Sequence, residues 1–330
     1  MKQKTVIDIL VILLLLFVFF FAYGDRYQIH NTNLDEAPEF YENMIAAPYI
    51  PKNIFFAEEK VPIEIYWVRE ALDKELTINC YQHSRTLQIF KRSGRYFPII
   101  EKILKEEGVP EDFKYLCVAE SGLDNVISPV AASGFWQFME TTGKSYGLEI
   151  NSEVDERYNI EKSTRAACRY IKGSKERLGS WSLAAAAYNM GETGVSNAIR
   201  NQKTNNYWNL YLNSETARYL YRIISYKLLF ENPRQYGIIL KNVDLYYPIP
   251  CEEVVIKSTI FDLYGFAEEH NILYWELKTL NPWLKNSKLT VKSKNYIIKI
   301  PRKSKLNYQY LYKDLKNPFN LLGDTVFHVE

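Results

Sequence analysis

The chain has 330 residues, of which 47% are hydrophobic and 24% are charged, and its formal net charge is +2. This composition is typical of a globular protein with room for two domains, and it excludes an intrinsically disordered chain. The balanced charge gives no support for nucleic-acid binding, which usually depends on a strongly basic face. The 26 tyrosines are numerous. Aromatic faces stack on sugar rings, but ordinary core and surface positions explain most of them.

The four cysteines do not form a recognisable motif. No two of them make a C-x-x-C pair, so a zinc or redox site is not supported. Two of them could be bridged in an exported protein, but the spacing does not show which. We favour buried free thiols, because an unpaired cysteine behaves as a small hydrophobic residue. The cysteines are Cys80, Cys117, Cys168 and Cys251.

Residues 1–24 indicate export. Lys2 and Lys4 precede an uncharged apolar run from Ile9 to Ala22, which is the pattern of a signal peptide. Residues 5–23 are also nearly long enough to span a bilayer, so an uncleaved membrane anchor is the alternative. No cysteine follows the run, which excludes a lipoprotein anchor. Either interpretation places the rest of the chain outside the cytoplasm.

The remaining chain divides by pattern. Residues 25–62 contain four prolines among polar residues and are predicted to be a linker or a loosely packed arm. Residues 63–236 have helical spacing almost throughout, which predicts an all-α domain. In residues 243–302, two short apolar runs flank a helical stretch, 260–280, that is broken at Asn271. The sequence therefore predicts a mainly α protein with a small β-α-α-β module, followed by a tail, 303–330, without a clear pattern.

One predicted helix places a carboxylic acid in an unusual position. Pro110 and the acids after it suit the first turn of a helix, and Ser121-Gly122 suits its end. Glu120 then lies beside apolar residues, near the negative end of the helix dipole. Both conditions favour the protonated form, which a general acid needs at neutral pH. A glutamate at a helix end is more often simply solvated, so this pattern alone is weak support.

Two later segments add polar groups. Ser133-Gly134 is predicted to turn closely into a short helix from which Gln137 presents its amide to a ligand. A helix with four consecutive alanines ends at Tyr188 and Asn189, whose phenol and amide could line a sugar cleft. The alternative for this helix end is an ordinary C-cap made by Asn and Gly. Asn213 is predicted to open a further helix, through Leu229.

Four segments in this order resemble the motifs of soluble-lytic-transglycosylase-type domains, glycoside hydrolase family 23. They are Ala119-Glu120-Ser121, Gly134-Phe135-Trp136-Gln137-Phe138-Met139, Ala187-Tyr188-Asn189 with Gly191-Glu192, and Asn213-x-Glu215-Thr216-x-x-Tyr219. Two further segments resemble the membrane-bound lytic murein transglycosylase D subgroup. They are Asp155-Glu156-Arg157-Tyr158 with Ser163-Thr164, and Thr142-Gly143-x-x-Tyr146-Gly147-Leu148.

The resemblance implies a lysozyme-like helical fold that acts on peptidoglycan in the periplasm or cell envelope. It assigns a role to each matching residue: Glu120 the catalytic acid, Ser121 the residue that steadies it, Ser128 a contact near the substrate's N-acetyl group, Gln137, Tyr188 and Asn189 the cleft lining, Glu215 an acid behind the cleft, and Tyr219 its aromatic neighbour. The sequence departs from the family at Glu140, where proline is usual, and in the loop before Ser128. We interpret both departures as changes of loop shape.

Glycoside hydrolysis usually needs two carboxylates, but the sequence supplies only one that is well placed. Asp124, Glu140 and Glu192 have no matching role. This predicts a substrate-assisted route in which Glu120 acts as acid and then as base, leaving 1,6-anhydromuramic acid ends, without metal or other cofactor. The alternatives are a lysozyme-type peptidoglycan hydrolase and a non-catalytic cell-wall-binding scaffold.

Residues 254–301 resemble a degenerate LysM repeat, a peptidoglycan-binding unit. The points of likeness are Thr259-Ile260-x-x-Leu263, Asn271-Ile272, Leu277, Leu280-Asn281-Pro282 and Ile298-x-Ile300-Pro301. Tyr274, Trp275 and Trp283 are candidate stacking surfaces for glycan, with packing against the catalytic domain as the alternative. The expected partner is therefore the peptidoglycan glycan strand, and the sequence identifies no protein partner.

Overall fold

The computed structural model describes residues 45–312 and 321–322. The expected signal or anchor in residues 1–24, the first part of the expected arm and most of the tail lie outside the described residues. Within the described residues, no helix is both long and apolar enough to cross a membrane.

The predicted mainly α fold with a small strand-containing module is confirmed. The helical part contains β1 (Phe55–Phe56), β2 (Glu59–Lys60), α2 (Tyr66–Tyr81), α3 (His83–Glu107), η2 (Glu111–Phe113), α4 (Lys114–Ser121), α5 (Glu140–Ser145), η3 (Glu156–Tyr158), α6 (Ile160–Leu178), α7 (Trp181–Met190), α8 (Glu192–Gln202), η4 (Tyr207–Asn209), α9 (Ser214–Glu231), η5 (Pro233–Tyr236) and η6 (Asn242–Asp244). The C-terminal module contains β3 (Cys251–Ile256), α10 (Leu263–Glu269), α11 (Tyr274–Leu280) and β4 (Tyr296–Pro301), and α12 (Tyr308–Tyr312) follows it.

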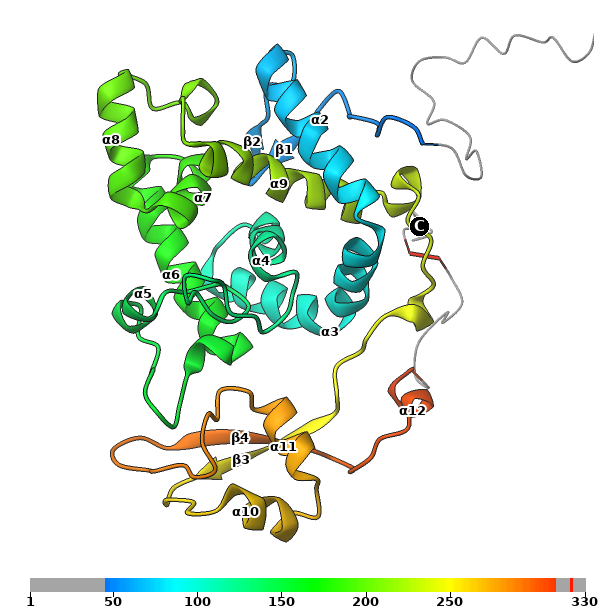
Figure 1. The fold of residues 1–330 in the computed structure, drawn as a ribbon, viewed down its shortest axis with the longest axis vertical. Coiled ribbons are helices and arrows are strands. Elements are labelled where there is room, and N and C mark those ends of the chain that lie inside the picture. The colour runs from blue at the N-terminus through cyan, green and yellow to red at the C-terminus, as the bar shows by residue number, and fades with distance from the viewer. Residues whose placement is uncertain (1–44, 313–320, 323–330) are drawn as a thin grey trace, which may run out of the picture. The chain divides into compact units, whose positions relative to one another are not determined.

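Helix α4 lies at the centre of the helical part, with α3, α6, α7 and α9 around it (Figure 1). Every residue from Lys114 to Ala119 is buried, as expected for a short helix that is enclosed on all sides. The chain enters α4 through the 3₁₀ turn η2, so the helix predicted to begin at Pro110 has a short irregular first turn. The catalytic candidate Glu120 is thus carried by the most enclosed helix of the domain.

Helices α7 and α9 are two of the helices that pack around α4 (Figure 1). The alanines of α7 are almost fully buried, because small side chains let the helix pack closely against α6, α8 and α9. Asn213 caps α9, as predicted, by accepting hydrogen bonds from the backbone N–H of Glu215 at 3.1 Å and of Thr216 at 3.0 Å. The cap fixes where α9 begins and so which of its residues face α4.

Residues 50–61 were expected to belong to a linker or loosely packed arm, and the structure differs. Ile54, Phe56 and Val61 are almost fully buried in the core of the helical part. Glu59 accepts hydrogen bonds from the backbone N–H of Trp181 at 2.6 Å and of Ser182 at 2.9 Å, which places its negative charge at the N-terminus of α7. Local proline content did not reveal these tertiary contacts.

The C-terminal module has the predicted β-α-α-β order. Strands β3 and β4 pair antiparallel, with Val254 opposite Ile298. The buried side chain of Asn281 ties α11 to β4: its amide donates to the Lys299 carbonyl at 2.7 Å, and its oxygen accepts from the Lys299 N–H at 2.8 Å. The first helix starts later than expected, because Ile260 pairs with Leu289 and α10 begins only after the cap at Asp262.

The apolar core of the module includes two residues of the helical part. Val154 and Tyr158 are buried in the same cluster as Leu263, Leu284 and Ile298. The module is therefore packed against the segment that connects α5 to α6.

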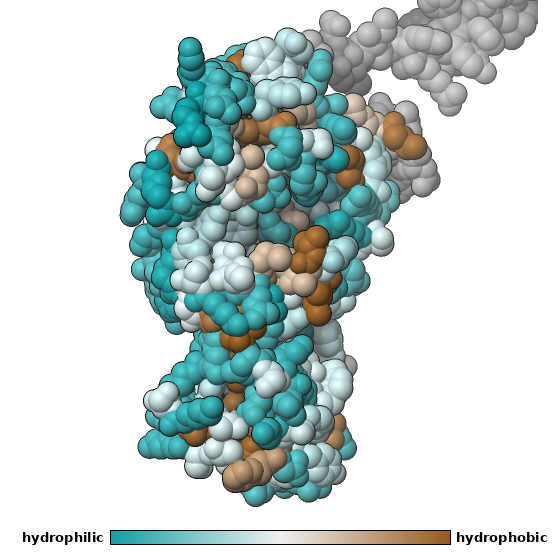
Figure 2. Space-filling model, turned by 60° about the vertical axis from the view of Figure 1, so that its left-hand side comes forward, coloured by the Kyte–Doolittle hydropathy of each residue, from teal (hydrophilic) through white to brown (hydrophobic). Residues whose placement is uncertain are grey.

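Figure 2 shows a face of the molecule that is mostly hydrophilic, with apolar residues in small separate patches, which is ordinary for a folded surface.

Residues 131–138, called here the 131–138 turn, are not the start of a short helix, as the sequence had suggested. They form a tight turn closed by bridges between Ile127 and Ser133 and between Ser133 and Phe138, and the next helix begins only at Glu140. Gly134 has a φ of +82°, and a Cβ added there would lie 2.0 Å from the carbonyl oxygen of Arg157. This close backbone contact explains why the position needs glycine.

Gly134→Ala should therefore lower the free energy of unfolding by ~2–4 kcal/mol, because it adds a steric clash to an unfavourable φ. Gly108→Ala is the matched control: its φ is +66°, but nothing lies within 4 Å of an added Cβ. We expect the control to lose only about 1–2 kcal/mol. Urea denaturation measures both, and equal losses would contradict the proposed clash.

Candidate active site

Glu120 lies in the last turn of α4, and the helix end is held firmly. Gly122 caps the helix with a φ of +62° and donates to the Val118 carbonyl at 2.8 Å. Arg92 of α3 binds both sides of the cap: it donates to the Gly122 carbonyl at 3.2 Å and pairs with Asp124 at 2.7 Å. Asp124 is thus part of the support of the helix end.

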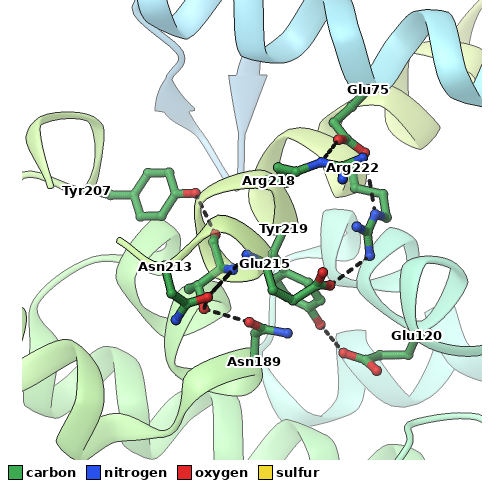
Figure 3. Close-up of polar contacts among 10 residues, drawn as sticks. Glu75, Glu120, Asn189, Tyr207, Asn213, Glu215, Arg218, Tyr219 and Arg222 are labelled. Atoms are coloured by element: carbon green, nitrogen blue, oxygen red, sulfur yellow. Dashed lines mark hydrogen bonds and ion pairs between the residues drawn. The ribbon is translucent and has the colours of Figure 1, made fainter. Parts of the chain in front are cut away.

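The Glu120 carboxyl points toward α9 (Figure 3). The hydroxyl of Tyr219 donates a short hydrogen bond to Glu120 Oε1. Tyr219 is only 2% exposed, and burial, followed by the nearby Glu120 charge, raises its pKa well above the ordinary value. The phenol therefore stays protonated and remains a donor to the carboxyl.

The pKa of Glu120 is raised from 4.5 to about 7. Burial is the largest cause, and the charge of Glu215 adds to it, whereas the Tyr219 hydrogen bond and the charge of Arg222 act in the opposite direction. The residue keeps partial access to solvent, but the surrounding protein desolvates its carboxyl. The expectation that this acid retains its proton near neutral pH agrees with this environment, although burial rather than the helix dipole is its main cause.

An ion-pair network that the sequence analysis missed lies behind Glu120 (Figure 3). Glu75 of α2 is buried, with only 1% of its side chain exposed, and binds both Arg218 and Arg222 of α9. Arg222 also reaches Glu215 at 3.2 Å. The guanidinium of Arg222 therefore holds Glu215, the acid whose charge raises the pKa of Glu120, in an ion pair and supplies a positive charge of its own.

A sequence signal for this network existed. Glu75 stands on the face of α2 that is otherwise built from Val68, Leu72 and Leu76. A charged residue on an apolar helix face needs a partner of opposite charge. Arg218 and Arg222 are one turn apart on the α9 pattern and could have supplied it.

The two predicted cleft residues of α7 lie near Glu120, and both are engaged. The Tyr188 hydroxyl donates to the Trp136 carbonyl at 2.8 Å, and after burial the charge of Glu120 is the largest cause that raises the pKa of Tyr188. Asn189 accepts from Thr216 at 2.7 Å. These side chains join α7 to the 131–138 turn and to α9.

The remaining candidates are held by loops. The Gln137 amide donates to the carbonyls of Val126 at 3.0 Å and Gly134 at 2.8 Å. Ser121 donates to the Cys117 carbonyl at 3.2 Å, within its own helix, rather than to Glu120. Ser128 accepts from the Ala132 N–H at 3.0 Å. The structure therefore brings Glu120, Tyr188 and Tyr219 together, whereas Gln137, Ser121 and Ser128 organise the surrounding backbone.

The candidate aromatics of the module separate clearly. Trp283 is 4% exposed and stacks on Tyr296 at 5.9 Å, so it packs in the core. Trp275 is 70% exposed and remains available for ligand contact. The four cysteines are free thiols, and three of them are buried as favoured from the sequence, whereas Cys251 is only half-buried.

No group of three or more metal-ligating side chains occurs among the described residues. A cavity of about 780 Å³ lies away from Glu120, between residues 144–154 and 288–296. None of the predicted site residues lines it.

Two segments of the chain match known protein families. Residues 97–211 match the family model of the transglycosylase SLT domain. Residues 252–304 match that of the soluble lytic transglycosylase C-terminal LysM-like domain. The chain carries a transglycosylase SLT domain. The matched SLT segment includes Glu120 and Tyr188, and Tyr219 lies just beyond its end.

Two kinds of relative share part of the chain. Membrane-bound lytic murein transglycosylase D of Escherichia coli K12 is 29% identical over 242 residues, which are 72% of this chain and 52% of that protein. A putative tributyltin chloride resistance protein of an Alteromonas species is 31% identical over 114 residues, 34% of this chain and 55% of that protein. The chain thus spans about half the length of the curated relatives it matches.

The raised pKa of Glu120 predicts a pH-dependent stability. Between pH 4.5 and about 7 the folded SLT domain holds a proton that the unfolded chain releases, so the free energy of unfolding falls as the pH rises through this window. Glu120→Gln has no such charge. Relative to the unsubstituted protein, it should gain about 2–3 kcal/mol on going from about pH 5 to about pH 8.

Urea denaturation at both pH values measures this gain. Glu176→Gln, at an exposed position on α6, is the control and should show little change. A Glu120→Gln protein that tracks the unsubstituted protein at both pH values would mean that the carboxyl is not desolvated.

Proposed function

We propose that the protein is a lytic transglycosylase that cleaves the β-1,4 bond between N-acetylmuramic acid and N-acetylglucosamine in peptidoglycan, with Glu120 as acid and then base. The observation that carries the proposal is a single carboxyl whose pKa is raised to about 7 and which accepts a hydrogen bond from a buried phenol. Such a group can give and take a proton at neutral pH. The SLT domain and the likeness to a murein transglycosylase support this substrate class.

The reaction balances without water. Protonated Glu120 gives its proton to the bridging oxygen, and the bond from that oxygen to C1 of N-acetylmuramic acid breaks. The substrate's own 2-acetamido oxygen stabilises the positive charge at C1. Ionised Glu120 then takes the proton of the C6 hydroxyl, and O6 bonds to C1 to close the 1,6-anhydro ring. The Tyr219 hydrogen bond favours the ionised carboxylate during this interval.

The surroundings of Glu120 favour the one-acid route. Glu215 is the acid whose charge acts on Glu120, and it is exposed and paired with Arg222. A carboxylate held in this way is poorly placed to activate a water or attack the sugar. A two-carboxylate hydrolysis would need such a group close to the scissile bond.

We assign supporting roles to the other candidates. Tyr188, Asn189 and Gln137 would contact the glycan, with Ser128 near the N-acetyl group, and Ser121 would support the end of α4. We place the catalytic domain from about Ile50 to Tyr236 and the module at residues 243–302. The exposed Trp275 makes the module a candidate glycan-binding surface. The apolar run in residues 5–23 supports a location in the cell envelope, by export or by anchoring.

Glu120→Gln should lower the cleavage rate by ~10²–10⁴-fold or more, because it removes the only proposed proton donor. Turbidity loss of purified peptidoglycan measures the rate. Mass spectrometry of the wild-type digest should show products one water lighter than hydrolysis products. Glu140→Gln, at an exposed glutamate that pairs only with Lys144 among the described residues, should retain activity. Reducing-end products would instead identify a lysozyme-type hydrolase.

The pH dependence of kcat/KM offers a second test. Because the free enzyme needs protonated Glu120, activity should fall as the pH rises above about 7. Arg222 lowers the pKa of Glu120, so Arg222→Gln should move this fall to higher pH. Arg218→Gln is the matched control, because Arg218 lies one turn before Arg222 on α9 and pairs with Glu75. This variant should leave the pH profile unchanged. A downward shift in Arg222→Gln would contradict the proposed electrostatics.

A further inference from the structure

The Asp155–Tyr158 motif lies between the C-terminal module and the 131–138 turn. Asp155 and Arg157 are both buried and form a two-point ion pair: Arg157 Nε donates to Asp155 Oδ1 at 3.0 Å and Nη2 to Oδ2 at 2.7 Å. Buried pairs of this kind keep their geometry because breaking them leaves an uncompensated charge. The proposed chemistry makes no direct use of either residue.

Arg157 holds both ends of the turn. Its Nη1 donates to the Ala131 carbonyl at 3.2 Å and to the Phe138 carbonyl at 3.1 Å. The backbone of the turn is unfavourable at two residues other than glycine, with φ values of +63° at Ala131 and +49° at Gln137, on either side of Gly134 at +82°. Such a conformation persists only where the surroundings impose it. The Arg157 side chain and its carbonyl, which touches Gly134, supply that constraint.

Asp155 is in turn held by the module. Its backbone N–H donates to the Trp283 carbonyl at 2.9 Å, and the adjacent Val154 pairs with Leu284. The Glu153 carbonyl accepts from the Lys285 N–H at 2.8 Å. The segment that carries the Asp155–Arg157 pair therefore runs like an added edge along the module.

Three acids of the same segment and one acid of the first turn of α6, Glu161, pair with lysines of the module, so the two surfaces have complementary charges. The pairs are Glu149–Lys294, Glu153–Lys288, Glu156–Lys294 and Glu161–Lys299. Together with the shared apolar core at Val154 and Tyr158, they describe a fixed interface rather than a module on a free linker.

The other side of the turn reaches the candidate active site. The Trp136 carbonyl accepts the Tyr188 hydroxyl at 2.8 Å, and the Phe138 ring lies 5.9 Å from the Tyr188 ring. Tyr188 lies close enough to Glu120 for the Glu120 charge to raise the pKa of Tyr188, second to burial. A continuous set of contacts therefore runs from the C-terminal module through Asp155 and Arg157 to the 131–138 turn and on to Tyr188.

We propose that Arg157 is a positioning residue for the substrate-binding side of the site, and that the C-terminal module acts as the structural support of the Asp155–Arg157 pair. The proposal rests on the proposed function, since it concerns the same cleft. It assigns the module a role in cleavage itself, separate from any capture of glycan. A planar guanidinium is required, because only its fork can bind a carboxylate at two points and two carbonyls at once.

The test uses the full chain and a short soluble peptidoglycan fragment, so that attachment to the wall does not affect the rate. Arg157→Lys keeps the charge but not the fork. It should raise KM and lower kcat/KM by about 10–100-fold, while the fall of activity at high pH stays where it is in the unsubstituted protein. Arg165→Lys is the matched control, because Arg165 of α6 only pairs with Glu106 and Glu107 among the described residues.

A variant on the module side covers the case in which Arg157→Lys fails to fold. Leu284→Ala loosens the interface at a buried position of the module and should raise KM in the same direction. Ile297→Ala shortens an exposed side chain of β4 and should leave KM unchanged. Thermal melting identifies the folded fraction. A purely structural effect would lower the amount of active enzyme, and so kcat, without changing KM.

The outcomes are separable. Folded Arg157→Lys and Leu284→Ala proteins with kcat/KM within about twofold of the unsubstituted chain would overturn the positioning role. No cleavage by the unsubstituted chain on any peptidoglycan substrate would overturn the proposed function instead.

Discussion

The candidate site depends on the burial of one carboxyl, that of Glu120. Glu120 can hold a proton near neutral pH only because α4 is enclosed on all sides and carries the side chain into a desolvated position. Small residues on α7 pack closely in the same core as α4, and Gly122 caps the end of α4. The protonated phenol of Tyr219 on α9 donates a hydrogen bond to the carboxyl. Burial disfavours the charged carboxylate, so the same desolvation that raises the pKa of Glu120 also lowers the stability of the fold when the group is ionised.

The desolvation is limited by opposing charges. Without any cation, a fully desolvated carboxyl would hold its proton too firmly to act as the base that the proposed reaction needs in its second half. Arg222 and the Tyr219 hydroxyl favour the ionised form, while Glu215 favours the protonated form. Glu75, buried beneath both arginines, fixes Arg222 in place. The pKa of Glu120 therefore depends on a salt-bridge network that includes Arg222, Glu215 and Glu75.

The sequence predicted what depends on local periodicity and on short motifs. Helix α9, its cap at Asn213 and the two strands of the module follow from residue spacing. The choice of Glu120 followed from the resemblance of its motif to the family, because its place at the end of an apolar helix was weak support alone. Contacts between distant segments were not predictable in this way. The burial of Ile54 and Phe56, the capping of α7 by Glu59 and the partner of Glu75 all join residues far apart in the chain. The shape of the 131–138 turn was predicted wrongly because it depends on the close approach of the distant Arg157 carbonyl and not only on the turn's own sequence.

That last error has a physical meaning. A segment with positive φ values at two residues other than glycine, Ala131 and Gln137, depends on its surroundings to keep that conformation. Here the surroundings are a buried arginine, the aspartate that orients it and the module that holds the aspartate. The proposed carbohydrate site would take its geometry from this scaffold, because Tyr188 is anchored to the backbone of the same turn. The module and the helical part share an apolar core, and the proposed role of the module is to support the candidate site through this shared interface.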